Sequence, residues 1–139
     1  MKVLALGGSG GMGRFAVETS MHFENVSEIV VADINAEEAL KFANSMNEKV
    51  SGIGLDVTDI DALKVQMNKA DVVINTVGPF FKYGPSILEA AIDSGCDYLD
   101  INDDWEPTIE MLGFHDKAES NSKTAIPVSY THLTLPTTE

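Results

Sequence analysis

The sequence predicts an α/β domain in which helices cover both faces of a doubly wound parallel sheet, giving three αβα layers. Three observations lead to this fold class. Short apolar runs alternate with segments of helical pattern along most of the chain. The length of 139 residues fits one domain, and 44% apolar with 22% charged residues is typical of a globular protein. Strands and helices that alternate at this spacing form βαβ units with right-handed crossovers.

In the first half of the chain, three apolar runs are each followed by a helical pattern. The runs are residues 3–6, 29–32 and 50–55, and the helical patterns are residues 12–23, 36–46 and 59–69. The third run alternates loosely, as a strand near a sheet edge does. Apolar residues in the helical patterns recur every three or four positions. Thr58 or Asp59 is placed to cap the third helix.

The second half of the chain continues the alternation. Strands are expected at residues 72–74, 98–101 and from residue 124, with helices between Pro85 and Gly95 and over residues 105–122, as one helix or two. Pro85 suits the first turn of a helix, where its missing N–H is not needed, and Gly95 suits a helix end.

The end of the chain does not follow this pattern. Residues 128–139 are rich in threonine, lack acids until Glu139 and show no helical face. They resemble a translated sequencing-adapter tail, so we leave them out of the fold as fusion scars are left out. We expect the natural sequence to be cut near Pro127, so that the fold is truncated near its sixth strand.

A glycine motif follows the first predicted strand and opens the first helix. Its pattern is G-x-G-x-x-G, formed by Gly8, Ser9, Gly10, Gly11, Met12 and Gly13. In a nucleotide-binding loop the first glycine permits the tight turn, the second admits a pyrophosphate and the third allows close helix packing. The free N–H groups at the helix start would then face phosphate oxygens. Residues 1–127 are therefore predicted to form a Rossmann-type dinucleotide-binding domain that is incomplete because it is cut near its sixth strand. Residues 128–139 are predicted to be a non-native-looking tail.

Asp33 indicates which nicotinamide cofactor the domain would take. It ends the second strand, 20 residues after Gly13, where a carboxylate accepts both hydroxyls of the adenosine ribose of NAD. A 2′-phosphate at about 4 Å would be repelled by about 4 kcal/mol per unit charge at an effective dielectric near 20. Ile34 and Asn35 follow, so no adjacent base offsets this repulsion. NAD is predicted over NADP. The alternative is that Asp33 is a helix-capping or turn acid.

Two further loops follow strands on the edge where the cofactor is expected. Asp56 and Val57 follow the third strand, where an acid and an apolar residue would flank the adenine, although Asp56 also fits a plain N-cap. Four residues after the fourth strand would lie beside the crevice, or else form an ordinary turn: Asn75, Val77, Gly78 and Pro79.

Three stretches of the sequence resemble the saccharopine dehydrogenase-like reductases. They are residues 7–14, residues 73–80 continued by Tyr83 and Gly84, and residues 90–100. The resemblance covers about residues 1–127 and implies a nicotinamide-binding domain that precedes a larger substrate and dimerisation domain. Members oxidise or reduce the C–N bond of secondary-amine amino acids with NAD(P), and relatives make polyamines. By position the glycine motif and Asp33 carry over as cofactor contacts, and residues 75 and 77–79 lie near the nicotinamide. The second domain is missing here.

An acidic loop follows the fifth predicted strand. It contains Asp103, Asp104, Trp105 and Glu106, which together would attract a substrate ammonium through charge and cation–π contact. The alternative is a solvated loop in which Trp105 is a hydrophobic anchor. The sequence identifies no catalytic residue. Because a hydride needs a positioned acceptor, we expect this chain alone to be inactive without the substrate domain.

Charge and cysteine content exclude other partners. Lys plus Arg is 9 and Asp plus Glu is 22, a net charge of 9 − 22 = −13, which repels nucleic acid and anionic membranes. The single Cys96 and the histidines have no metal-ligand spacing, so no metal is predicted. No apolar segment is long enough for a signal peptide or a membrane span, which indicates a cytoplasmic protein.

Two functional hypotheses remain open. The first is the NAD-binding part of an oxidoreductase with a small-molecule substrate, whose parent protein would be a homodimer. The second is a non-catalytic regulatory domain that senses NAD. The chain has no Walker A lysine and no Tyr-x-x-x-Lys pair, which argues against P-loop proteins and short-chain dehydrogenases.

Overall fold

The computed structural model describes residues 1–127, which form a six-stranded parallel sheet in the order β3-β2-β1-β4-β5-β6. The predicted tail, residues 128–139, lies outside the described residues. Within residues 1–127, six strands and six helices alternate, except that two helices precede the last strand: β1 Lys2–Leu6, α1 Gly11–Ser20, β2 Glu28–Asp33, α2 Ala36–Asn44, β3 Val50–Gly54, α3 Ile60–Met67, β4 Val72–Asn75, α4 Phe80–Asp93, β5 Asp97–Asp100, α5 Trp105–Leu112, α6 His115–Ser120 and β6 Ala125–Ile126.

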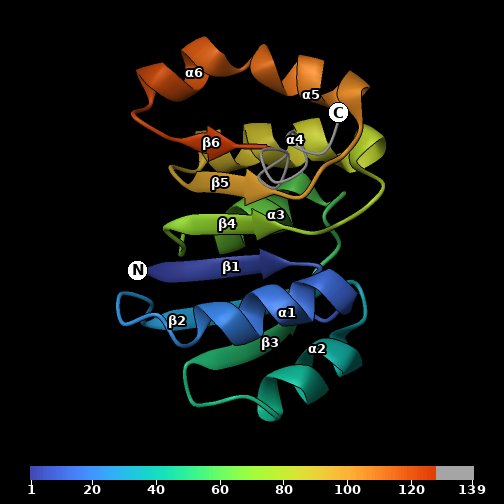
Figure 1. Ribbon diagram of the computed structural model, residues 1–139, viewed down its shortest axis with the longest axis vertical. Helices are drawn as coiled ribbons and strands as arrows, with labels where there is room; N and C mark the ends of the chain where they lie inside the picture. Colours follow the sequence, from blue (N-terminus) through green and yellow to red (C-terminus); the bar gives the residue numbers. More distant parts are fainter. Residues whose placement is uncertain (128–139) are drawn as a thin grey trace, which may run out of the picture.

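The sheet separates two hydrophobic cores, which confirms the predicted three layers. Side chains of β1 alternate between the two faces, with Leu4 and Leu6 in one core and Val3 and Ala5 in the other. The first core is completed by apolar residues of α3 to α6, and the second by those of α1 and α2. In Figure 1, α1 lies in front of the sheet while α3 and α4 lie behind it.

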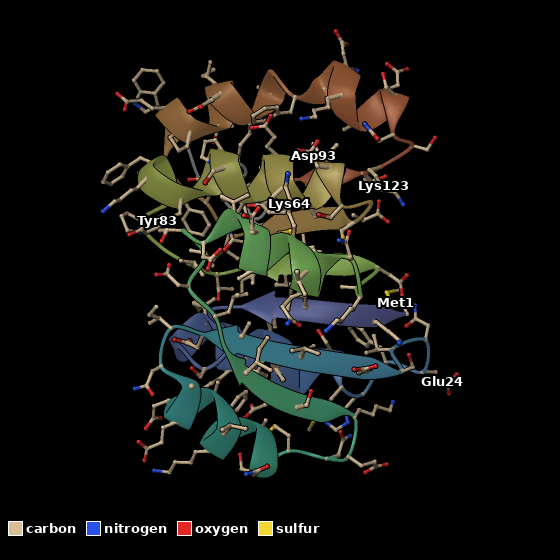
Figure 2. The ribbon with its side chains drawn as sticks, turned by 180° about the vertical axis from the view of Figure 1, so that it is seen from behind. Met1, Glu24, Lys64, Tyr83, Asp93 and Lys123 are labelled. Carbon is tan, nitrogen blue, oxygen red and sulfur yellow. The ribbon has the colours of Figure 1, made fainter. Side chains whose placement is uncertain are left out.

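Ion pairs join the helices of the rear face. Lys64 of α3 lies 3.4 Å from Asp93 at the end of α4, and both are labelled in Figure 2. Lys117 of α6 reaches the same carboxylate at 2.8 Å and Glu89 at 3.0 Å. The hydrogen bond from Lys117 lowers the pKa of Asp93 below its usual value. These pairs are partly exposed, so each contributes about 1 kcal/mol or less to stability.

The start of α4 differs from the prediction. The helix begins at Phe80, after Pro79 as its N-cap, so Pro85 lies inside the helix instead of in its first turn. The first turn is closed by the amides of Lys82 and Tyr83, which donate to the carbonyl of Pro79 at 3.1 and 3.2 Å. The prediction for Gly95 is confirmed: it follows the C-cap with a φ of +77°, in the left-handed region that favours glycine.

The sheet order reverses between β1 and β4, which are parallel neighbours although 69 residues separate Val3 from its partner Val72. In open α/β sheets a ligand binds outside the carboxyl ends of the strands at such a reversal. No helix within residues 1–127 is both long enough and apolar enough to cross a membrane.

Candidate dinucleotide-binding site

A cavity of about 600 Å³ opens at the carboxyl ends of the strands on both sides of the β1–β4 reversal. This volume is in the range of sites for small ligands and cofactors. Its lining comes from the ends of β1 to β4 and from α4: Gly7, Gly10, Ala32, Asp33, Ile34, Leu55, Asp56, Val57, Thr58, Thr76, Val77, Gly78 and Tyr83. Figure 2 shows Tyr83 beside this end of the sheet.

The tight turn after β1 includes both Gly7 and Gly8, since the N–H of Gly10 donates to the carbonyl of Gly7 at 3.0 Å, but the positive φ belongs to Gly7 and not to Gly8. Gly7 has a φ of +71°, and its N–H donates to the carbonyl of Ala32 at 2.8 Å. A Cβ on Gly8 would lie 2.9 Å from the carbonyl oxygen of Ala5, so Gly8 is required by the close packing of the loop on β1. Thr76 fixes the same turn from β4, because its hydroxyl lies 2.9 Å from the carbonyl oxygen of Leu6.

The start of α1 is arranged as the glycine motif predicts. Gly10 is the N-cap and no side chain caps this helix end, so N–H groups of its first turn remain for a ligand. A Cβ on Gly13 would lie 2.7 Å from the Cα of Gly8, which shows the close packing expected of the third glycine. A Cβ on Gly11 meets nothing within 4 Å, and the side chain of Met12 is exposed.

Asp33 is tied directly to the glycine loop. The hydroxyl of Ser9 donates to Asp33 Oδ2 at 2.6 Å, and the N–H of Asn35 donates to Oδ1 at 3.3 Å. Asn35, which accepts from the N–H of Glu38, is the N-cap of α2, so Asp33 does not cap that helix. Its carboxylate lines the cavity at the end of β2, beside the loop predicted to hold the pyrophosphate.

Asp56 and Val57 both line the cavity after β3. The N-cap of α3 is Asp59, whose side chain accepts from the N–H of Ala62, so the alternative of Asp56 as a plain N-cap is wrong. Asp56 instead accepts from the N–H and the hydroxyl of Thr58 at 2.9 and 2.7 Å. These hydrogen bonds lower the pKa of Asp56.

The loop after β4 divides into exposed and buried parts. Val77 and Gly78 line the cavity, whereas the side chain of Asn75 is fully buried and absent from the described lining. Asn75 Oδ1 accepts from the N–H of Val77 at 3.0 Å and its Nδ2 donates to the hydroxyl of Tyr98 at 3.0 Å. The peptide bond between Gly78 and Pro79 is cis, and Pro79 is the N-cap of α4 and does not line the cavity.

The acidic loop after β5 does not join this cavity within the described residues. Asp104 is the N-cap of α5 and Trp105 is its first residue, with the tryptophan 74% exposed. The alternative of Trp105 as a hydrophobic anchor is therefore wrong for this chain. Asp103 and Glu106 are also exposed, and none of the four residues lines the cavity.

Arg14 is a site residue that the sequence interpretation missed. Its Nε donates to the carbonyl of Ser9 at 2.6 Å, its Nη2 lies 3.3 Å from Glu38, and its guanidinium stacks 4.8 Å from the ring centroid of Phe42. A cation is thus held next to the Ser9–Asp33 pair. The available signal was that Arg14 is the only arginine in the sequence and directly follows the glycine motif.

A group of three possible metal ligands was also missed. His115, Asp116 and Glu119 place ligand atoms within 4.8 Å of one another on α6. All three side chains are exposed, and the group is not part of the cavity lining. Their i, i+1, i+4 spacing on one helix was the signal available in the sequence.

Comparison with known proteins identifies this arrangement. The family model of the saccharopine dehydrogenase NADP binding domain matches residues 3–126. The chain belongs to this family. The match spans nearly all of the described residues and includes every residue of the cavity lining. The resemblance of the three sequence stretches is thereby confirmed, and the chain corresponds to the NAD(P)-binding domain of saccharopine dehydrogenase-like oxidoreductases.

Two relatives show how much of a longer protein this chain matches. The chain is 30% identical over 130 residues to a probable mitochondrial saccharopine dehydrogenase-like oxidoreductase of Arabidopsis thaliana. The alignment covers 84% of this chain and 29% of the plant protein. It is also 30% identical over 110 residues to a lipid droplet localized protein of Caenorhabditis elegans. This alignment covers 72% of this chain and 26% of the nematode protein. The chain thus spans less than a third of either relative.

A solved structure shares the fold. Apo saccharopine dehydrogenase (L-Glu forming) of Saccharomyces cerevisiae superposes with a TM-score of 0.77 at 22% identity, over 91% of this chain and 26% of the yeast protein. At this identity the likeness supports the Rossmann-type fold and not a particular substrate.

Proposed function

We propose that residues 1–127 bind NAD as the nucleotide domain of an oxidoreductase that transfers a hydride at a C–N bond of an amino-acid or polyamine-related substrate. The observation that carries this proposal is the cavity at the strand reversal, where the uncapped start of α1 and the carboxylate of Asp33 both face one space. The dinucleotide would lie across β1, with its adenosine toward Asp33 and its nicotinamide toward Val77 and Gly78.

The preference for NAD over NADP is argued from charge. Asp33 places a carboxylate where the adenosine ribose is expected, and Ser9 fixes its orientation at 2.6 Å. Arg14, the nearby cation, is already engaged by the carbonyl of Ser9 and by Glu38. Binding a 2′-phosphate would require Arg14 to leave these partners and would still bring two negative groups together. The family is named for NADP, so this preference is a distinguishing property proposed for this chain.

The proposal also covers the kind of substrate, the oligomeric state of the parent protein and its location in the cell. The substrate is a small molecule whose ammonium group is attracted by the acidic loop, residues 103–106, and the parent protein is a homodimer without nucleic-acid or membrane partners. We place the protein in the cytoplasm, although the name of the plant relative assigns that protein to mitochondria. The chain alone binds the nucleotide without turnover, because it holds no acceptor in position.

Calorimetric titration with NADH and NADPH tests the proposal. The wild-type chain is expected to bind NADH at least about tenfold more tightly than NADPH, since a tenfold ratio requires only about 1.4 kcal/mol of the charge repulsion. Asp33→Asn retains an acceptor for Ser9 but removes the charge, so NADPH affinity should rise about tenfold and the preference should disappear.

Glu37→Gln is the matched control, because it removes one negative charge from the exposed first turn of α2 without lining the cavity. It should leave the NADH-to-NADPH ratio within about twofold of wild type. Equal binding of the two nucleotides by the wild type would refute the role of Asp33. A folded chain that binds neither would refute the nucleotide site itself.

A further inference from the structure

We propose that Tyr98 and Asp100 are positioning residues that hold the end of β4 and the loop after it, residues 75–78, in place for the nicotinamide half of the bound cofactor. This inference rests on the proposed function of the cavity. It concerns residues of β5 that do not line the cavity and that act through Asn75.

The observation is a chain of buried hydrogen bonds beneath the cavity. Asn75 Nδ2 donates to the hydroxyl of Tyr98 at 3.0 Å, and that hydroxyl donates to Asp100 Oδ2 at 2.7 Å. Asn75 and Asp100 are fully buried and Tyr98 is 1% exposed. Burial of a carboxylate and an amide opposes folding unless hydrogen bonds satisfy them, so a packed apolar strand end would be simpler to build.

The direction of donation along these hydrogen bonds fixes the orientation of the Asn75 side chain. The Tyr98 hydroxyl has one hydrogen, which Asp100 accepts, so its oxygen is left to accept from an amide N–H. Asn75 therefore turns its Nδ2 toward Tyr98 and its Oδ1 toward the N–H of Val77, 3.0 Å away. Val77 and Gly78 line the cavity, so the carboxylate of Asp100 influences, through three hydrogen bonds in series, how this loop meets a ligand.

Two further features keep this network of hydrogen bonds in one arrangement. Burial raises the pKa of Tyr98 well above its usual value, which favours the protonated phenol that donates to Asp100. Asp100 Oδ1 accepts from the N–H of Asn102 at 3.0 Å, and Asn102 in turn accepts from Asp104 and donates to Thr108. The same network thus orders both the loop after β4 and the loop that begins α5.

The experiment compares two ligands that share the adenosine and pyrophosphate but differ at the nicotinamide. The 139-residue chain is titrated with NADH and with ADP-ribose, first as wild type and then as Tyr98→Phe. In Tyr98→Phe the ADP-ribose affinity should stay within about twofold, whereas NADH affinity should fall about tenfold, the loss expected when a buried hydrogen bond is removed and its partner is left unsatisfied.

Two variants complete the test. Asp100→Asn keeps an acceptor for Tyr98 but removes the charge, so NADH affinity should fall about threefold with ADP-ribose unchanged; it carries the test if Tyr98→Phe does not fold. Cys96→Ala is the control, since Cys96 is a buried residue just before β5 whose thiol contacts the carbonyl of Met67 and not this network. It should destabilise the fold without changing the NADH-to-ADP-ribose ratio.

The outcomes separate this inference from the proposed function. A wild type that binds neither ligand refutes the nucleotide site, and this inference with it. A wild type that binds both, with the same ratio in Tyr98→Phe or in Asp100→Asn, refutes the positioning role alone. If Cys96→Ala lowers the ratio of NADH to ADP-ribose affinity as much as Tyr98→Phe does, the positioning role is also refuted. The loss would then come from general destabilisation of β5.

Discussion

Gly11 and Gly13 are two positions apart in the glycine motif but have very different surroundings. A methyl group on Gly13 would lie 2.7 and 2.8 Å from backbone atoms of Gly8 and Gly7, which cannot yield as a flexible side chain can. We expect Gly13→Ala to lower the free energy of unfolding by about 1–3 kcal/mol through overpacking. Urea unfolding followed by circular dichroism measures this change.

Gly11→Ala is the matched substitution in the same motif. The added methyl group meets nothing within 4 Å, and alanine favours the helix, so stability should stay equal or rise by up to about 1 kcal/mol. Equal stability of the two variants would contradict the close packing of the loop against α1.

The residues of the site were predictable only in part. The sequence places a glycine loop and Asp33 together because both follow adjacent parallel strands, and Ser9 does reach Asp33. It does not show that Gly7 and not Gly8 has the positive φ, since two neighbouring glycines are equally able to adopt it. Nor does it show that Arg14 turns back to the carbonyl of Ser9, because a side-chain direction depends on the packing of Phe42 beneath it.

At the scale of elements, β5 and the residue just before it carry two buried groups whose protonated forms are favoured by burial. Burial raises the pKa of the Cys96 thiol, just before the strand, from 9.0 to about 11, and it raises the pKa of Tyr98 well above 10.0. In the unfolded chain both groups lose their protons at their ordinary pKa values. The stability they contribute is therefore complete below pH 9 and is lost progressively as pH rises above it.

We therefore expect the free energy of unfolding to be nearly constant from about pH 7 to 8.5 and to fall steadily toward pH 10.5. Urea unfolding at each pH measures this dependence. Cys96→Ala should reduce the slope between pH 9 and 10.5, because one titrating group has been removed. A slope that is the same in wild type and variant would show that the thiol is not protected by the fold.

The start of α4 shows where prediction of elements fails. Proline is favoured in a first helical turn, and this preference led to a helix beginning at Pro85. The structure begins the helix at Phe80 and tolerates Pro85 inside it, where the proline is buried. Tertiary packing overrides the local preference here: a Cβ on Gly84 would lie 2.5 Å from Cε of Met111, so this turn is in close contact with α5. The strands, which have stronger patterns, were predicted to within about two residues.

At the scale of the whole molecule, the net charge of −13 opposes the approach of an anionic nucleotide. Raising the salt concentration from about 10 mM to 150 mM shortens the screening length from about 30 Å to 8 Å, so this long-range repulsion weakens. We expect NADH affinity to increase about two- to fivefold over this range, as measured by calorimetry. Adenosine, which has no phosphate, is the control and should show no such increase; a decrease in NADH affinity with salt would contradict the expectation.

The doubly wound architecture followed from the sequence because it depends on many weak signals that agree. Each apolar run predicts a strand, each helical pattern predicts a crossover, and the right-handed rule limits the topologies that can connect them. The strand order itself is known from the structure and was not predicted. The acidic loop shows the limit of this reasoning. Its position after β5 is correct, yet Trp105 is 74% exposed, because which face of α5 packs on α4 is decided by Met111 and not by the largest apolar side chain.

The pairing of β1 with β4 has a kinetic consequence. Joining these strands closes the long segment of chain between Val3 and Val72, and the entropic cost of such closure makes contacts of long sequence separation slow to form. The cavity has Gly7 and Gly10 on one side of this seam and Val77 and Gly78 on the other. We therefore expect competence to bind the nucleotide to be acquired only when the two halves of the sheet meet. A bound cofactor would in turn hold the seam closed and slow its opening.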